Sequence, residues 1–219
     1  MEEAKQLKEE LRARGVVGIA LDIDDTLGDS NLSWFSNLLS FKNIEGETAE
    51  SLIKKHAHVE EVADWNTPEA FEFMGELIHS SEFNEAIPLI GNANHVVNEI
   101  NKKVPIVAYI TARPAMVAEA TKRWLRRHGF PEAPLIMRPP TIEVSKDDLE
   151  KRNQWKSKLL NYLYPEVRGI VDDNLGLVDE LADLNYQGTH YLYGKALDKQ
   201  APHLVVCPTW EDVAKSVKP

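Results

Sequence analysis

The chain has little cysteine, no long apolar run and no excess of basic residues. Among its 219 residues only Cys207 is a cysteine, which excludes an internal disulfide and fits a reducing compartment. No apolar run approaches the length needed to span a bilayer, and residues 1–7 lack the apolar core of a secretory signal. These absences predict a cytoplasmic protein with no membrane partner. Residues 204–206 are apolar, so we expect Cys207 to be a small buried side chain.

The charge balance narrows the class of partner. A formal net charge of −10 argues against binding long nucleic acids, which requires a basic surface. It leaves room for a small phosphorylated substrate, because a metal ion and a few local cations can hold one phosphate. The chain contains no Gly-x-x-x-x-Gly-Lys-Ser/Thr loop, so a P-loop kinase is not supported.

The most informative segment present is an apolar, β-prone run that ends in acidic residues. It predicts a strand from about Val16 to Asp22, followed by Asp24 and Asp25. Alternate residues of a strand point to the same side, so Asp22 and Asp24 share a side if the extended conformation continues. Two close carboxylates repel unless a cation lies between them, and Mg²⁺ prefers oxygen ligands and pairs with phosphate. The alternative is that these aspartates are turn formers or helix N-caps.

The order of predicted elements indicates an α/β fold. Residues 2–14 predict a surface helix that ends at Gly15, and from residue 87 onward helices and strands alternate. This alternation implies a mostly parallel sheet covered on both faces, that is, a Rossmann-like three-layer core. The predicted strands after residue 87 are 105–110, 135–137, 167–171, 189–193 and 204–206, and the predicted helices are 94–103, 114–128, 145–162 and one around 175–181.

The stretch between the first two predicted strands is helical in pattern. Trp34 and Phe35 share helical spacing with the leucines that follow, which favours a small core of this stretch over contact with a substrate. A second helix is predicted around 52–62, and Thr67-Pro68 indicates an N-cap that opens a third. We therefore predict a catalytic core of residues 1–29 and 87–219, with an inserted helical cap of residues 30–86 that lies over the strand ends as a lid.

Two further predicted strands end in polar side chains. Thr111 follows one of them and precedes a helix, where a hydroxyl beside free N–H groups suits an anion such as phosphate. Asp172 and Asp173 follow another. Each alone is equally explained as a helix cap, but three such sites in one βα protein are hard to explain by capping.

Taken together, these segments resemble the motifs of the haloacid dehalogenase-like (HAD) superfamily. Residues 22–27, with the sequence Asp-Ile-Asp-Asp-Thr-Leu, are similar to its first motif, and residues 110–113 to its second. A lysine near position 156 is similar to the third motif, and residues 169–174 to the fourth. An insertion between the first two motifs resembles the C1 type of cap. The resemblance is to phosphatase branches, because the dehalogenases lack the second aspartate of the first motif, present here as Asp24.

The resemblance implies roles that the chemistry of the residues also supports. Asp22 would attack phosphorus and form an aspartyl-phosphate, and Asp24 would act as general acid and base. Mg²⁺ would be held by Asp22, Asp172 and the main-chain carbonyl of Asp24. Asp173 would orient these ligands or act through water. Thr111 would hold the phosphoryl oxygens together with a lysine.

Two assignments leave alternatives. Lys156 fits the third motif best and is expected to be catalytic and to bind substrate, while Lys158 and the more distant Lys146 are the other candidates. Positions 156 and 158 face different sides of a helix, so one of the two reaches the site. Arg113 is predicted to bind substrate phosphate, and pairing with an acid is its alternative.

The sequence thus predicts an Mg²⁺-dependent phosphatase that hydrolyses a small phosphate monoester through an aspartyl-phosphate on Asp22. One alternative is a phosphotransferase or mutase of the same fold. Another is a HAD-like domain that has lost catalysis and binds a ligand or partner, against which the presence of both Asp22 and Asp24 argues.

Overall fold

A single parallel β-sheet organises the chain. The computed structural model describes residues 2–56, 59–142, 149–197 and 200–219. The described residues form a six-stranded sheet in the order β3-β2-β1-β4-β5-β6, and each neighbouring pair is parallel. This confirms the predicted α/β class with a Rossmann-like core. The strands are β1 (Gly18–Leu21), β2 (Ile106–Pro114), β3 (Leu135–Arg138), β4 (Val167–Asp172), β5 (Thr189–Tyr193) and β6 (Leu204–Cys207).

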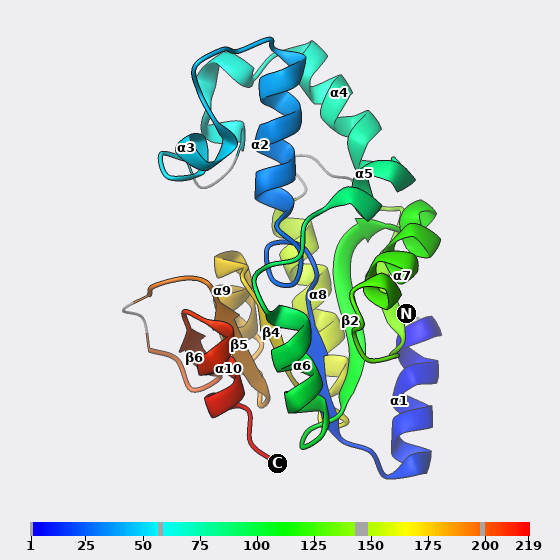
Figure 1. Cartoon of the computed structure of the whole chain (residues 1–219). Coiled ribbons are helices and arrows are strands. Elements are labelled where there is room, and N and C mark those ends of the chain that lie inside the picture. Colours follow the sequence, from blue (N-terminus) through cyan, green and yellow to red (C-terminus); the bar gives the residue numbers. More distant parts are fainter. Residues whose placement is uncertain (1, 57–58, 143–148, 198–199) are drawn as a thin grey trace.

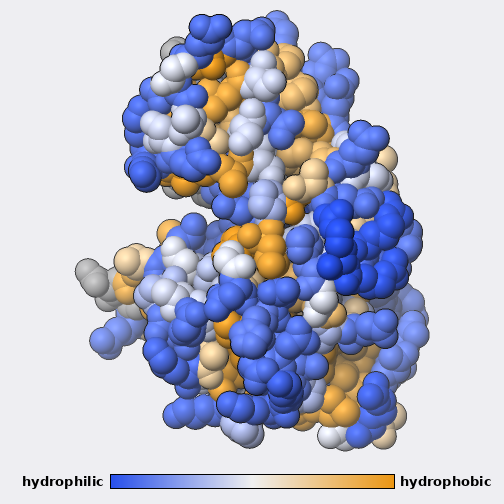
Figure 2. All heavy atoms as spheres, in the orientation of Figure 1, coloured by the Kyte–Doolittle hydropathy of each residue, from blue (hydrophilic) through white to orange (hydrophobic). Residues whose placement is uncertain are grey.

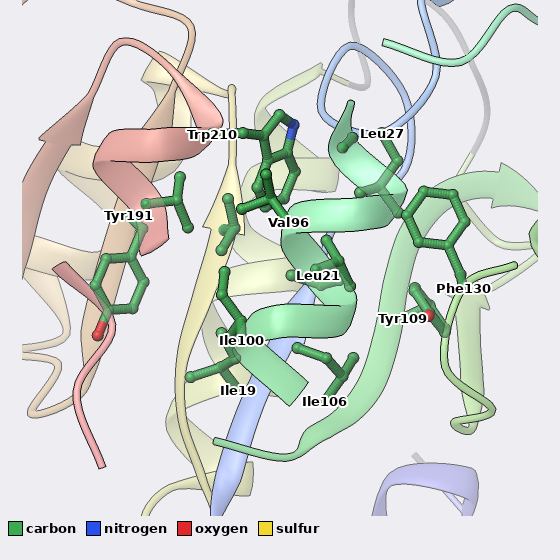
Figure 3. Close-up of a cluster of buried hydrophobic side chains, with 14 of the residues drawn as sticks. Ile19, Leu21, Leu27, Val96, Ile100, Ile106, Tyr109, Phe130, Tyr191 and Trp210 are labelled. Atoms are coloured by element: carbon green, nitrogen blue, oxygen red, sulfur yellow. The ribbon is translucent and has the colours of Figure 1, made fainter. Parts of the chain in front are cut away.

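Helices cover both faces of this sheet (Figure 1). Alternation along β1 explains the layers, because Ile19 and Leu21 face one side of the sheet and Ala20 faces the other. Figure 3 shows the first cluster, in which Ile19 and Leu21 pack with Ile100 and Trp210. Helices of that face are α6 (Ala93–Asn101), α7 (Ala118–Arg127) and α10 (Trp210–Ser216), and those of the other face are α1 (Glu2–Arg14), α8 (Leu149–Leu163) and α9 (Leu175–Asp183).

The stretch from residue 30 to residue 86, here called the inserted segment, projects from one end of the sheet (Figure 1). Phe35 and Trp65 are buried in its own hydrophobic cluster, and Trp34 packs against that cluster. Thr67 caps its longest late helix as predicted, because its side chain accepts from the Ala70 N–H. The elements of the segment are α2 (Ser30–Phe41), α3 (Ala49–Ile53), the 3-10 turns η1 (Val59–Glu61) and η2 (Ala63–Trp65), α4 (Pro68–Ile78) and α5 (Ser81–Ala86).

The two connections between the inserted segment and the core run side by side. The Asp29 N–H donates to the Pro88 carbonyl, and the Ile90 N–H donates to the Leu27 carbonyl, both at 2.8 Å. Gly28 lies between them, where a Cβ atom would meet Ile87 at 2.9 Å. Figure 2 shows a notch between the lobe of the inserted segment and the lobe of the core, above α9 in this view.

Several predicted bounds change in the structure. The helix predicted around 52–62 is wrong, because α3 ends at Ile53 and, among the residues of this stretch that the structure describes, only the 3-10 turn Val59–Glu61 follows. β2 continues to Pro114, so Thr111 lies inside the strand rather than after it. α7 therefore begins at Ala118, after the 3-10 turn η3 (Ala115–Val117). No helix is predicted from sequence after residue 206, whereas α10 forms there with Thr209 as its N-cap. Cys207 is buried as predicted.

Within the described residues, no helix combines the length and apolar character required to cross a membrane.

Glu166 anchors α1 to the start of β4. Its Oε1 accepts from Arg12 Nε at 2.9 Å, and Lys8 Nζ lies 3.7 Å from Oε2. Burial raises the pKa of Glu166, but the hydrogen bonds it accepts and the charges of Arg12 and Lys8 outweigh burial and lower the pKa overall. A lowered pKa stabilises the folded state above the unfolded pKa, and this contribution is lost as pH falls through the folded pKa.

We therefore expect Glu166→Gln to lower the free energy of unfolding by about 1 kcal/mol at neutral pH, since Arg12 is largely exposed. The difference from wild type should shrink as pH falls below the ordinary pKa of a glutamate. Urea unfolding followed by circular dichroism at several pH values measures it, with the exposed Glu9→Gln on the same helix as control. A deficit that does not change with pH would contradict the ion-pair explanation.

Candidate active site at the carboxyl end of the sheet

Two buried aspartates lie at the ends of neighbouring strands. Leu21 of β1 is in register with Val171 of β4, so the residues that follow, Asp22 and Asp172, are adjacent at the carboxyl end of the sheet. The Asp22 N–H donates to the Val171 carbonyl at 2.9 Å and fixes this end of β1. Asp22 is 6% exposed and Asp172 is fully buried. The strand order reverses between β1 and β4, which is where open α/β sheets bind ligands.

Lys156 joins these two carboxylates. Its Nζ donates to Asp22 Oδ1 and to Asp172 Oδ2, each at 2.8 Å. The lysine comes from α8, which packs against β4 with Leu159 and Leu160 in the core of that face. Lys158, two residues further along the same helix, is exposed. Lys146 lies outside the described residues.

A third carboxylate completes an acidic cluster. Carboxylate oxygens of Asp22, Asp172 and Asp173 lie within 4.8 Å of one another. Metal binding by the main-chain carbonyl of Asp24 stays a prediction. The cluster offers the hard oxygen donors that Mg²⁺ takes.

The charges of the cluster are not balanced by Lys156 alone. Burial raises the pKa of Asp22 well above its ordinary value, Lys156 lowers it, and the carboxylates of Asp172 and Asp24 raise it further. Burial, with Asp172 and Asp25 nearby, raises the pKa of Asp173 to about 7. Burial lowers the pKa of Lys156, but Asp172 and Asp22 outweigh it and raise the pKa overall. Three carboxylates thus share two lysines, Lys156 and Lys195, and the remaining negative charge fits a site that takes a further cation.

Asp24 faces a different partner. Arg113 Nη2 donates to Asp24 Oδ1 at 2.8 Å, and Arg113 Nε lies 3.1 Å from Oδ1 and 3.0 Å from Oδ2. The fully buried Thr111 hydroxyl lies 3.5 Å from Asp24 Oδ2 and accepts from the Arg113 N–H at 3.2 Å. The structure therefore shows Arg113 paired with an acid, the alternative in the sequence analysis, while its contact with substrate phosphate stays a prediction.

The turn after Asp24 connects the site to the inserted segment. Asp25 has a φ of +54°, in the left-handed region, and its Oδ1 accepts from the Asn31 N–H at 2.8 Å. Burial raises the pKa of Asp25 to about 6, although the bond from Asn31 lowers it. Asp29 caps α2 by accepting from the Leu32 N–H. Some acids of this stretch thus do cap a helix, whereas Asp22 does not.

Three side-chain contacts around the acidic cluster were not predicted from sequence. Asn174 donates its N–H to Asp172 Oδ1 at 2.9 Å and its side chain to Asn153 Oδ1 at 2.7 Å. Asn153 precedes Lys156 by three residues, and that helical spacing was the available signal. Lys195, in the loop after β5, lies 3.3 Å from Asp173 Oδ2. Nothing in its local sequence distinguishes Lys195 from a surface lysine.

Two solved structures resemble this arrangement of elements. A HAD-superfamily hydrolase of subfamily IA, variant 1, from Geobacter sulfurreducens PCA matches with a TM-score of 0.50 and 14% identity, over 83% of this chain and 89% of that chain. The chain has a HAD-like α/β fold. A HAD-superfamily hydrolase from Ehrlichia chaffeensis matches with a TM-score of 0.49 and 13% identity, over 90% and 94% of the two chains. At such identities the likeness concerns the HAD fold and not the substrate.

A family profile described as PITM 1-3, LNS2 domain matches residues 70–173, slightly less than half of the chain. The matched segment contains the predicted site residues from Thr111 to Asp172 and begins after Asp22 and Asp24. Comparison with curated proteins gave no match.

Proposed function

We propose that the protein hydrolyses a phosphate monoester, with Mg²⁺, through an aspartyl-phosphate on Asp22. The observation that carries this proposal is the pair of buried carboxylates, Asp22 and Asp172, held 2.8 Å from one lysine at the strand-order reversal of a HAD fold. Asp173 adds a third carboxylate, so that three carboxylates share the two lysines Lys156 and Lys195. Burying such carboxylates costs free energy unless a counter-charge is present, which favours a bound cation.

The donor set fits Mg²⁺. Asp22 and Asp172 would hold the ion directly, the Asp24 carbonyl would contribute a third protein ligand, and Asp173 would contact it directly or through water. When bound, Mg²⁺ neutralises negative charge that develops on the transferring phosphoryl group.

The chain's own side chains divide the reaction into two displacements. In the first, an Asp22 carboxylate oxygen forms a bond to phosphorus while the bond to the leaving oxygen breaks, and that oxygen receives a proton from Asp24 acting as general acid. In the second, Asp24 takes a proton from water, the water oxygen bonds to phosphorus, and phosphate departs with the Asp22 carboxylate restored. Lys156 and Thr111 hold the phosphoryl oxygens in both steps.

The inserted segment would select the leaving group and exclude water. Its lobe faces the core lobe across the notch in Figure 2, and it begins a few residues after Asp22. Segments that close over a site protect a reactive intermediate from unwanted attack. We propose a small phosphorylated molecule as substrate, because the net charge of −10 disfavours long nucleic acids.

Phosphate release from a panel of small monoesters tests the proposal. We expect Mg²⁺-dependent turnover that EDTA abolishes and that exceeds an Asp22→Asn control for at least one ester. The same assay with added acceptor alcohols separates hydrolysis from phosphotransfer, since transfer yields a new ester in place of inorganic phosphate. Release equal to that of Asp22→Asn across the whole panel would instead identify a binding domain.

A further inference from the structure

We infer that Arg113 is a positioning residue for Asp24: its guanidinium holds the Asp24 carboxyl in the direction in which it exchanges protons with the leaving oxygen and with water. This inference rests on the proposed function and assigns Arg113 a role other than binding the substrate phosphate. Two observations support it: the hydrogen bonds between Arg113 and Asp24, and the contacts that hold the Arg113 side chain against the core.

The guanidinium engages both oxygens of Asp24. Nε lies 3.1 and 3.0 Å from Oδ1 and Oδ2, and Nη2 lies 2.8 Å from Oδ1. The Arg113 side chain is 3% exposed, whereas that of Asp24 is 33% exposed. One edge of the Asp24 carboxyl is therefore fixed from inside the protein while the side chain stays accessible to a substrate. Such a planar fork defines direction as well as distance, which a lysine ammonium does not.

The core in turn holds Arg113 in place. Its Nη1 donates to the hydroxyl of Thr121, a fully buried residue of α7, at 3.3 Å. Its guanidinium carbon lies 5.9 Å from the ring centre of Trp124, one helical turn further on. Trp124 is itself fixed, because its Nε1 donates to the Ile87 carbonyl at 2.7 Å. These contacts hold the guanidinium inside the protein, where its side chain is 3% exposed.

Removing the guanidinium frees the Asp24 carboxyl to rotate. The negative charges of Asp22 and Asp25 repel the Asp24 carboxylate, so without the guanidinium they would turn it out of its present direction. Small misplacements of a catalytic group cost on the order of 10²-fold in rate. The defect is therefore expected in proton transfer specifically, and not in binding of the phosphoryl group, which Lys156 and Thr111 retain.

Esters with different leaving groups separate these effects. A p-nitrophenolate leaves without protonation, whereas an alkoxide requires the acid, and kcat/KM reports steps up to formation of the aspartyl-phosphate. For Arg113→Gln we expect kcat/KM to fall about 10²-fold with an alkyl phosphate and by less than about 5-fold with p-nitrophenyl phosphate. With the aryl ester kcat should fall more than kcat/KM, and a burst of p-nitrophenolate should appear because hydrolysis of the intermediate needs the base. Arg113→Lys should recover little of the loss.

Arg138→Gln is the matched control. Arg138 is another buried arginine at the same end of the sheet, and its Nε donates to the Ala112 carbonyl at 2.7 Å. A purely structural arginine should lower kcat/KM for both esters by the same factor. A double-mutant cycle adds a second test: in an Asp24→Asn background, Arg113→Gln should cost no further activity with the alkyl phosphate, because the two residues act as one unit.

Equal losses with both esters, or additive losses in the double-mutant cycle, would overturn the inference. Arg113 would then bind the substrate phosphate or have a structural role. A wild-type protein no faster than Asp22→Asn would overturn the proposed function, and this inference with it, in a measurement that involves no Arg113 variant. If Arg113→Gln does not fold, Thr121→Val removes one anchor of the guanidinium and should show the same ester dependence at about 3–5-fold, since a single buried hydrogen bond is lost. Absence of any ester dependence in Thr121→Val would then count against the inference.

Discussion

Replacing Asp22 with asparagine is expected to lower kcat for phosphate monoesters by about 10⁶-fold, the scale observed when the nucleophile of a covalent mechanism is removed. The amide is nearly the same size as the carboxylate, so it keeps the packing at the end of β1. It is a poor nucleophile, and it no longer offers a charged oxygen to Lys156 or to a metal ion. Phosphate release and acid-quench trapping of the labelled aspartyl-phosphate both measure the change.

Asp29→Asn serves as the control for this prediction. Asp29 belongs to the same acidic stretch, but its side chain caps α2 by accepting from the Leu32 N–H, which an asparagine also does. We expect its activity within about 2-fold of wild type, since Asn and Asp are similar caps. Retention of a labelled phospho-protein in Asp22→Asn would place the nucleophile on another residue.

Replacing Lys156 with methionine is expected to affect stability as well as turnover. The Lys156 side chain is 5% exposed and lies 2.8 Å from two carboxylates, so its loss leaves Asp22 and Asp172 buried without their cation. Removal of one partner from a buried ion pair costs about 3–5 kcal/mol. Loss of a charged group that contacts the transferring phosphoryl costs about 10²–10³-fold in rate. Urea unfolding in EDTA and kcat/KM in Mg²⁺ measure the two effects.

Magnesium should restore part of the lost stability in Lys156→Met, because a bound divalent ion compensates the two carboxylates. The variant is therefore expected to show a larger Mg²⁺-induced rise in unfolding free energy than wild type. Lys158→Met is the control, since Lys158 is exposed on the same helix and should change neither quantity. An equal Mg²⁺ effect in Lys156→Met and wild type would argue that the ion binds away from these carboxylates.

The strands of the core could be predicted from sequence because each is a short apolar run bounded by turn-forming residues. Thr189–Tyr193 forms the strand with the predicted bounds, and β4 extends the prediction by one residue to Asp172. The prediction fails around 52–62, where four apolar residues suggest one helix. These apolar residues pack into the small hydrophobic cluster of the inserted segment from separate short elements. Tertiary packing therefore overrides the helical periodicity of the sequence.

The buried part of the site also followed from sequence, since residues at the ends of neighbouring parallel strands must meet. Asp22 and Asp172 meet for this reason, and Lys156 reaches them from α8. The pairing of Arg113 with Asp24 was left open, because both a phosphate and a carboxylate satisfy a guanidinium. What decides it is the position of Thr121 and Trp124 on α7, which depends on how that helix packs. Lys195 was missed because only the folded loop brings it to Asp173.

The inserted segment leaves and re-enters the core through two neighbouring, hydrogen-bonded connections, at Leu27–Asp29 and Pro88–Ile90. Its two ends are thus as close together as the ends of a hairpin, although more than fifty residues lie between them. A chain with this geometry can exchange the whole segment for another of different size without moving a strand of the sheet. Grafting a two-residue turn between Gly28 and Pro88 would then give a minimal protein that keeps the six-stranded sheet and lacks the inserted segment.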